Sequence, residues 1–119
     1  MSIQKLLYVF TQAPYSNSSG LEGLDATLIG AAFEQHVSVL FVYDGVFLLK
    51  DKQTPAASIK QFTKTFKVLE DFGVDNVYVD SLSLSARGLS QEQLICDTNA
   101  IDVSRVKRLI AKQDKVFTF

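Results

Sequence analysis

The sequence contains one cysteine, Cys96, and one histidine, His36, and this shortage excludes two kinds of stabilisation. A single thiol cannot form an internal disulfide bond, and one Cys with one His cannot supply the ligand set of a structural zinc site. We therefore expect neither a disulfide nor a metal. A chain with so little use for cysteine suits a reducing compartment, which favours a cytoplasmic location.

An excess of charge of one sign is also missing, because 12 Lys and Arg stand against 13 Asp and Glu, for a formal charge of -1. A domain that depends on phosphate contacts normally carries a clear positive excess, so direct nucleic-acid binding is not expected. The most apolar stretch, residues 37–49, is interrupted by Asp44 and Gly45 and is too short to cross a bilayer as a helix. The amino-terminal residues lack a signal-peptide cleavage pattern, so we predict no export and no membrane insertion.

What the chain does contain is the material for one hydrophobic core, with 47% hydrophobic residues and nine phenylalanines among 119 residues. This length is close to the commonest domain size, and a chain of this size buries roughly two thirds of its unfolded surface. We therefore predict a single domain that spans residues 1–119.

Apolar runs alternate along the chain with residues at helical spacing. The runs predict strands at residues 6–10, 37–43, 76–80, 93–96 and 115–119. Helices are predicted at about 19–35, 54–72 and 102–110, with a further short helix within 81–88. Each connection between parallel strands crosses over the sheet, so this order predicts an α/β fold with a mostly parallel sheet and helices on both faces.

Short polar motifs predict where the helices begin. Ser19 and Glu22 have the spacing of a capping box, in which each side chain binds one free amide of the first turn. Thr54 before Pro55 is typical of an N-cap followed by the first helical residue. Asp102 is placed to cap the last helix.

Four segments occur in an order that resembles the DsrE/DsrF family, and most closely its TusC (DsrF-like) subunits. They are Tyr8-Val9-Phe10-Thr11-Gln12-Ala13-Pro14, Gly20-Leu21-Glu22-Gly23-Leu24-Asp25-Ala26, Asp44-Gly45-Val46-Phe47-Leu48-Leu49 and Leu84-Ser85-Ala86-Arg87-Gly88-Leu89, and the chain closes with Val116-Phe117-Thr118-Phe119. The resemblance covers nearly the whole chain. It implies a flavodoxin-like domain of three layers.

The resemblance also implies a function. It places the chain in a TusBCD-like sulfur-relay complex with TusB-like and TusD-like subunits, as a heterohexamer with two copies of each. Such a relay passes persulfide sulfur between cysteines and ends in 2-thiolation of the wobble uridine of certain transfer RNAs. Two alternatives stay open: a subunit of a DsrEFH-like sulfur-oxidation complex, and a stand-alone flavodoxin-like protein that binds a cofactor.

The family's reactive cysteine lies after the third strand, at a fixed distance before the glycine of an Arg-Gly pair. Counting back eight residues from Gly88 reaches Asp80, and the flanking Val79 and Ser81 are not thiols either. A carboxylate cannot carry a persulfide. The resemblance therefore implies that the active cysteine belongs to the TusD-like partner, and that this chain has no catalytic residue and no cofactor.

The remaining thiol, Cys96, has two interpretations. A sulfur relay requires thiolate chemistry, which makes Cys96 a candidate carrier. It follows Leu94 and Ile95, however, in a predicted strand where a cysteine behaves as a small buried hydrophobe. We therefore predict a structural role.

Gly20 and Gly23, at the start of the first helix, are small residues of the kind found in a phosphate-binding turn. Glu22 between them would repel a phosphate, so close helix packing is the better prediction. Asp25 and Asp44 are possible acid–base residues, although a carboxylate before Gly45 is more typical of a turn. His36, the only histidine, is interpreted as a cation at the end of the first helix.

Val46, Phe47, Leu48 and Leu49 continue past the Asp-Gly turn without alternation. Such a run is either an extension of the core or a contact surface, and both alternatives stay open. The basic residues of the last helix are spaced around its polar side and are interpreted as a solvated face rather than a site for transfer RNA. They are Arg105, Lys107, Arg108 and Lys112.

Overall fold

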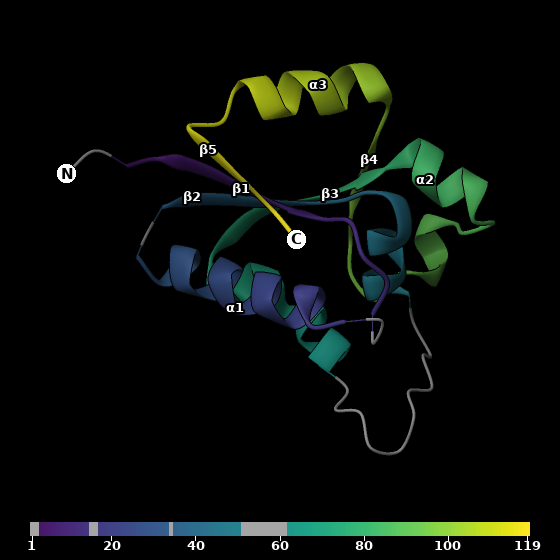
Figure 1. Cartoon of the computed structure of the whole chain (residues 1–119), viewed down its shortest axis with the longest axis horizontal. Helices are drawn as coiled ribbons and strands as arrows, with labels where there is room; N and C mark the ends of the chain where they lie inside the picture. The colour runs from purple at the N-terminus through teal and green to yellow at the C-terminus, as the bar shows by residue number, and fades with distance from the viewer. Residues whose placement is uncertain (1–2, 15–16, 34, 51–61) are drawn as a thin grey trace.

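A computed structural model describes residues 3–14, 17–33, 35–50 and 62–119 of the chain. Its centre is a five-stranded sheet in the order β4-β3-β2-β1-β5, in which every pairing is parallel (Figure 1). The strands are β1 (Lys5–Phe10), β2 (His36–Phe41), β3 (Val74–Asp80), β4 (Asn99–Ile101) and β5 (Lys115–Thr118). The helices are α1 (Ser19–Ala32), α2 (Ser81–Ala86), α3 (Val103–Ala111) and three 3₁₀ helices, η1 (Tyr43–Leu49), η2 (Phe62–Phe72) and η3 (Gln91–Gln93). The predicted α/β fold is confirmed.

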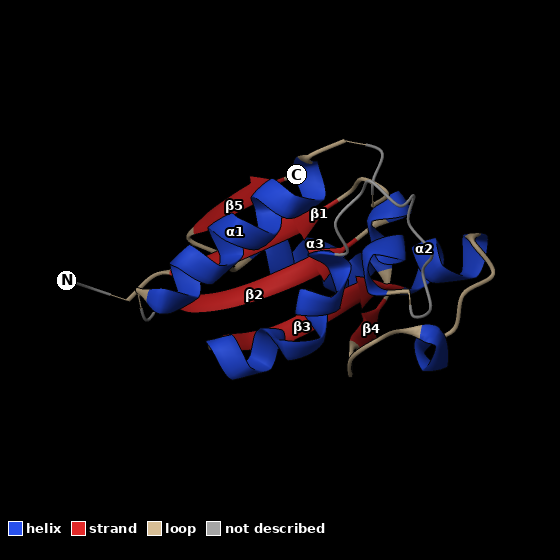
Figure 2. Ribbon diagram, turned by 90° about the horizontal axis from the view of Figure 1, so that it is seen from below, coloured by secondary structure: helices blue, strands red, loops and turns tan. Residues whose placement is uncertain are grey.

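The two faces of the sheet are covered unequally (Figures 1 and 2). The chain steps from β1 to β2 to β3 in one direction, so right-handed crossovers place α1 and η2 on the same face. From β4 the chain returns across three strands to β5, and the reversed direction places α3 on the opposite face. One face therefore has two helices and the other has α3.

The core lies on both sides of β1 and β2, which explains why their sequences are apolar runs without alternation. On the α1 side, the ring of Phe10 stacks on Phe41 at 4.9 Å and meets the edge of Phe66 at 5.5 Å. On the α3 side, a smaller cluster holds buried residues of β1, β2 and β4 with Val106 and Leu109 of α3 packed on it. The central strands are thus fixed from both faces.

Two predicted strands differ from the structure in more than their first residues, whereas the third strand begins two residues before its predicted start, at Val74. The fourth strand is Asn99–Ile101 and not residues 93–96, where Leu94 makes an isolated antiparallel bridge to Lys50. Leu94 is apolar because its side chain is buried in the core, not because its backbone joins the sheet. The second strand ends at Phe41, and Tyr43 already belongs to η1.

The helix starts were predicted with mixed success. Asp102 is the cap of α3, and its Oδ1 accepts a hydrogen bond from the Arg105 amide at 2.9 Å. The Ser19–Glu22 capping box is wrong, because α1 is preceded by Ser18, whose hydroxyl donates to Glu22 Oε1 at 2.8 Å. The Ser19 amide instead donates to Asn17 Oδ1 at 2.9 Å, so the side chain of a residue before the helix accepts this hydrogen bond. The Thr54–Pro55 start lies outside the described residues.

Helix α1 is also shorter than predicted, since it ends at Ala32 and not near residue 35. His36 is consequently the first residue of β2 and not a cation at the helix end, and its Nδ1 lies 3.3 Å from Asp75 Oδ2. Across the described ranges, no helix is both long and apolar enough to cross a membrane.

Gly45 allows a close approach between two segments of the chain. A Cβ atom at this position would overlap the carbonyl oxygen of Phe10 and lie 2.5 Å from its carbonyl carbon. That oxygen accepts a hydrogen bond from the Val42 amide at 3.0 Å, so neither side has room to move. The Asp-Gly pair after β2 therefore serves packing against β1.

We expect the Gly45→Ala substitution to lower the free energy of unfolding by about 3 kcal/mol, because backbone atoms must shift to admit the new methyl group. The matched control is Gly88→Ala, where no atom lies within 4 Å of the added Cβ and only the positive φ of 66° is strained. That variant should lose about 1–2 kcal/mol. Urea denaturation of both variants tests this, and equal losses would contradict it.

Candidate functional site

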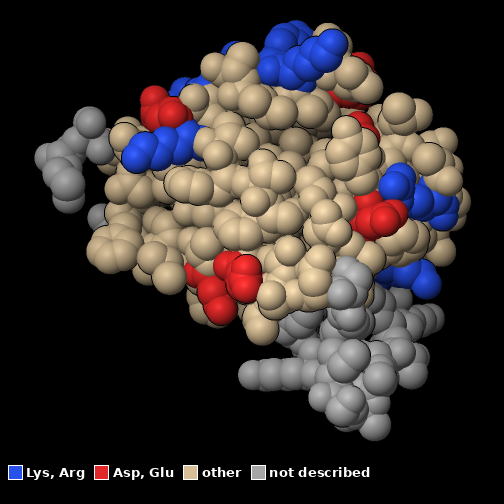
Figure 3. Space-filling model, in the orientation of Figure 1, with Lys and Arg blue, Asp and Glu red and all other residues tan. Residues whose placement is uncertain are grey.

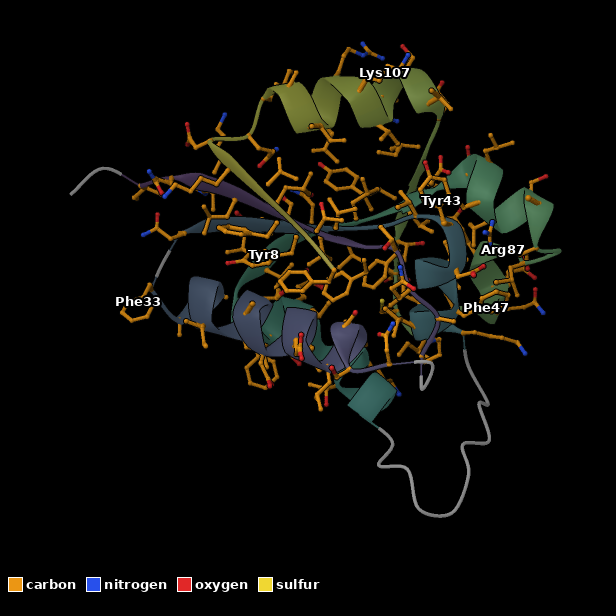
Figure 4. All side chains as sticks on the ribbon, in the orientation of Figure 1. Tyr8, Phe33, Tyr43, Phe47, Arg87 and Lys107 are labelled. Atoms are coloured by element: carbon orange, nitrogen blue, oxygen red, sulfur yellow. The ribbon has the colours of Figure 1, made fainter. Side chains whose placement is uncertain are left out.

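The carboxyl ends of β2 and β3 lie next to each other and are the part of an open α/β sheet where ligand sites gather. η1 begins just after β2, and α2 begins directly after β3. Figure 4 shows Tyr43 and Phe47 of η1 and Arg87 of the α2 end together at this end of the molecule. The candidate site consists of Tyr43, Asp44, Asp80, Ser83 and Arg87.

Asp80, which the sequence pattern predicts to occupy the family's cysteine position, is a buried helix cap. It is the last residue of β3, only 8% of its surface is exposed, and it caps α2. Its Oδ2 accepts hydrogen bonds from the Ser83 hydroxyl at 2.5 Å and from the Ser83 amide at 3.1 Å. Its Oδ1 is buried and has no hydrogen-bond partner among the described residues. Asp80 therefore acts through structure, as an acceptor for the first turn of α2.

Ser83 connects Asp80 to the segment after β2. Its Oγ donates to Asp80 and accepts a hydrogen bond from the Tyr43 amide at 2.8 Å. Tyr43 needs this support, because at φ 51° it is the one non-glycine residue with positive φ in the described part of the chain. Such a conformation costs about 1–2 kcal/mol for a residue with a Cβ. The hydroxyl of Ser83 thus holds η1 against α2.

A second link joins the same two segments. Arg87 Nε donates to Asp44 Oδ1 at 2.9 Å, and an Nη of Arg87 donates to the Ser83 carbonyl at 3.2 Å. Asp44 is exposed, so the ion pair itself is worth little, about 0–1 kcal/mol. Its role is geometric, since it orients the guanidinium group across the η1–α2 junction.

The sequence brought Asp44 and Asp80 to attention but not their partners. Ser83 and Arg87 were missed because serine and arginine in a polar segment carry no local signal of a contact 40 residues away. The spacing was visible nevertheless. Asp80 and Ser83 have the separation of an N-cap and the third helical residue, which is the ordinary arrangement for a capping side chain.

Cys96 lies apart from this site, in the loop between η3 and β4. It is half-buried and borders a cavity of about 460 Å³ that Phe66, Leu69 and Ile95 also line. Burial, followed by the negative charge of Asp97, raises the pKa of the thiol to about 11. Nearly all of it is protonated at neutral pH, so its nucleophilicity is low.

The other predicted site residues have packing or surface positions. Gly20 and Gly23 are buried in α1, and a Cβ on Gly23 would lie 2.5 Å from the Phe10 ring and 2.8 Å from the Phe119 ring. Gly23 therefore serves helix packing. Asp25 is exposed on α1 away from the site. Within the described ranges, no three His, Cys, Asp or Glu residues are grouped as a metal ion would need.

The interface candidates of the sequence need a correction. Val46, Leu48 and Leu49 are 0% exposed, so they belong to the core, and a partner could not reach them. The 3₁₀ helix turns three of the four apolar side chains inward, which a strand extension would not do. Phe47 is the exception, because it is partly exposed.

These elements define a class of protein, a flavodoxin-like α/β domain with a parallel five-stranded sheet. Its polar site lies at the carboxyl ends of β2 and β3. Two solved structures share the fold. The ychN protein from E. coli superposes with a TM-score of 0.84 at 22% identity, covering 98% of this chain and 100% of that one. MTH1491 from Methanobacterium thermoautotrophicum gives 0.70 at 14% identity, covering 98% and 99%.

The chain belongs to the DsrE/DsrF-like family, whose sequence model matches residues 4–119. Its relatives carry two names. The intracellular sulfur oxidation protein DsrF of Allochromatium vinosum is 38% identical over 98% of this chain and 97% of its own length. TusC homologs of Vibrio vulnificus and Pseudomonas aeruginosa are 36% and 38% identical, over 98% and 97% of this chain and over 100% and 98% of their own lengths.

Replacing Ser83 with alanine should lower the free energy of unfolding by about 1–3 kcal/mol, because the Tyr43 amide and the Asp80 carboxylate both lose a partner. Ser85→Ala is the matched control, since Ser85 is exposed on the same short helix. That variant should change the free energy by less than about 0.5 kcal/mol. Denaturant titration of both measures the difference, and a Ser83→Ala value as small as the control's contradicts the bridging role.

Alkylation of Cys96 should be slow at neutral pH and accelerate as the pH rises. With a pKa of about 11, only about one thiol in 10⁴ is ionised at pH 7. The iodoacetamide rate of the folded chain should therefore rise about tenfold per pH unit up to pH 10. The urea-unfolded chain is the control and should react with the pKa of an ordinary thiol. A folded-state midpoint below pH 8 would show that the thiol is activated.

Proposed function

We propose that this protein is a non-catalytic subunit of a cytoplasmic TusBCD-like sulfur-relay complex. In this proposal the complex delivers persulfide sulfur for 2-thiolation of the wobble uridine of transfer RNA. The active cysteine belongs to a TusD-like partner, and TusB-like and TusD-like chains complete a heterohexamer with two copies of each subunit. The names of the relatives support the family context, and the site supports the non-catalytic role.

The single observation that carries the proposal is the state of Asp80. Sulfur transfer between proteins proceeds by thiolate attack and needs a sulfur atom at the reacting position. Here that position holds a buried carboxylate that is hydrogen bonded to the Ser83 hydroxyl at 2.5 Å. The carboxylate caps α2 and, through Ser83, supports the start of η1, so its role is structural.

Cys96 does not replace the missing thiol in this proposal. A relay cysteine requires appreciable thiolate near neutral pH, whereas burial and Asp97 raise the pKa of Cys96 to about 11. Among the described residues, its cavity is not lined by any residue of the Asp80 site. A sulfur atom bound to Cys96 would therefore face a different cavity from the Asp80 site.

The surface beside β5 supports a subunit role. β5 is an edge strand of the sheet, and edge strands offer unpaired backbone groups to a partner. Large apolar side chains are exposed on β5, on α3 and at the carboxyl end of α1. They are Val116 and Phe117 of β5, Ile110 of α3, Ile29 of α1, and Phe33 directly after α1. Figure 4 shows Phe33 pointing away from the body of the domain.

The second candidate is a subunit of a DsrEFH-like sulfur-oxidation complex. The specific observation in its favour is the 38% identity to DsrF of Allochromatium vinosum, which equals the value for the Pseudomonas TusC homolog. Both candidates use the same scaffold argument. They differ in the acceptor of the sulfur, so transfer-RNA thiolation in a deletion strain separates them.

In a complex reconstituted with TusB-like and TusD-like chains, Asp80→Asn and Cys96→Ser should each retain sulfur transfer within about twofold, because neither side chain handles sulfur. The measurement is transfer of radiolabelled persulfide sulfur to the next carrier. The control is removal of the partner's reactive cysteine, which should abolish transfer. Loss of transfer in Cys96→Ser, with the complex still assembled, would sink the non-catalytic role.

Assembly should depend on the exposed apolar side chains at the carboxyl end of α1. We expect Ile29→Asp together with Phe33→Asp to dissociate the complex, since both side chains are exposed in the single chain and their replacement leaves the core intact. Phe47→Asp tests the remaining interface candidate from the sequence in the same way. Native mass spectrometry reads the subunit composition, with Leu82→Asp on α2 as an exposed control. An unchanged heterohexamer in the double variant would exclude this surface.

A further inference from the structure

A cleft with a basic rim lies beside α3, on the sheet face opposite α1. It has a volume of about 320 Å³ and is lined by Tyr78, Ile101, Arg105, Arg108, Leu109 and Lys112. The topology explains why it exists. A helix is about 10 Å wide whereas five strands at about 4.8 Å spacing are wider. α3 therefore leaves part of this face open beside β3 and β4.

The charge of the cleft is one-sided. Arg105 and Arg108 of α3 and the C-cap residue Lys112 have i, i+3 and i+7 spacing and all line the cleft, and no Asp or Glu of the described residues lines it. Both ion pairs found in the described part of the chain lie elsewhere, at His36–Asp75 and Arg87–Asp44. Like charges at these spacings destabilise a helix by a few tenths of a kcal/mol each, so helix stability does not account for the cluster. Figure 3 shows Lys and Arg gathered over α3.

The floor of the cleft has a different character. Ile101 is buried, Leu109 is partly buried, and Tyr78 is a half-buried aromatic residue of β3 with a phenol group. A ligand that fits has a flat, partly apolar body and more than one negative charge. An arginine fork matches phosphate oxygens in bidentate geometry, and an aromatic ring provides a stacking surface for a base.

We propose that this cleft binds the phosphate and base of a nucleotide unit, either a free nucleotide or one unit of single-stranded RNA. Its volume is at the lower end of the range for small-ligand sites, which suits one such unit. The net charge of -1 does not oppose this, since it is an average over the chain and the cations of α3 are local. The proposal is independent of the sulfur relay and can fail or hold without it.

Binding is tested with the full chain by fluorescence anisotropy of a fluorescein-labelled eight-nucleotide RNA, with AMP and ADP as competitors. Arg108→Gln should weaken RNA binding about tenfold. It should also reduce the slope of log K, the association constant, against log salt concentration by about one, which corresponds to the loss of one phosphate contact. Lys107→Gln is the matched control, because it removes the same charge from the same helix on the side away from the sheet (Figure 4). It should change affinity less than twofold. Tyr78→Leu should weaken binding without altering the salt dependence.

The outcomes separate the sources of the ligand. Competition by AMP or ADP supports a free nucleotide, and RNA binding that mononucleotides do not compete supports an RNA strand. Equal losses in Lys107→Gln and Arg108→Gln would overturn the cleft as a site, because they indicate unspecific charge attraction. Tighter binding of a poly-glutamate peptide than of RNA, or no binding of either phosphate ligand up to about 1 mM, would also overturn it.

Discussion

The hydroxyl of Ser83 is the contact on which the polar end of this domain depends. One oxygen atom donates to the buried carboxylate of Asp80 and accepts from the amide of Tyr43, at 2.5 and 2.8 Å. It thereby joins the end of β3 to the turn after β2 and supports a backbone conformation that a residue with a Cβ avoids. The ion pair of Arg87 with Asp44 spans the same junction. Asp80 is therefore part of a structural network, and its role there is that of a helix cap.

The topology of the sheet explains the division of the remaining surface. Four strands follow each other in one direction, and only the return from β4 to β5 crosses the other face. α1 and η2 consequently seal one face with aromatic packing, whereas α3 covers the other only in part. The uncovered surface on one side of α3 is basic, and the exposed side chains of Val116 and Phe117 on the edge strand β5 are apolar. The single crossover through α3 thus leaves a basic cleft on one face of the sheet.

Several features could be predicted from the sequence because their causes are local. The apolar run at residues 6–10 is buried from both sides, Asp102 caps the helix that follows it, and both were confirmed. The fourth strand and the capping box were wrong for the same reason: burial and hydrogen bonding by other segments overrode the local pattern. Leu94 is apolar because it fills the core from a loop, and the Ser19 amide is taken by Asn17. From the sequence, the run that contains Val46, Leu48 and Leu49 could be either core or contact surface. In the structure η1 turns these three side chains into the core.

The sequence by itself determined the fold class, the presence of a single thiol and the membership that the four segments indicated, because residue type and spacing are properties of the chain alone. Only the tertiary structure decided that Asp80 is buried, that Ser83 joins it to Tyr43, that Cys96 has a raised pKa, and that three cations line a cleft that no carboxylate among the described residues lines. Those properties depend on which groups lie within a few ångströms of one another in the folded chain. Distance in space, unlike distance along the chain, is set by packing.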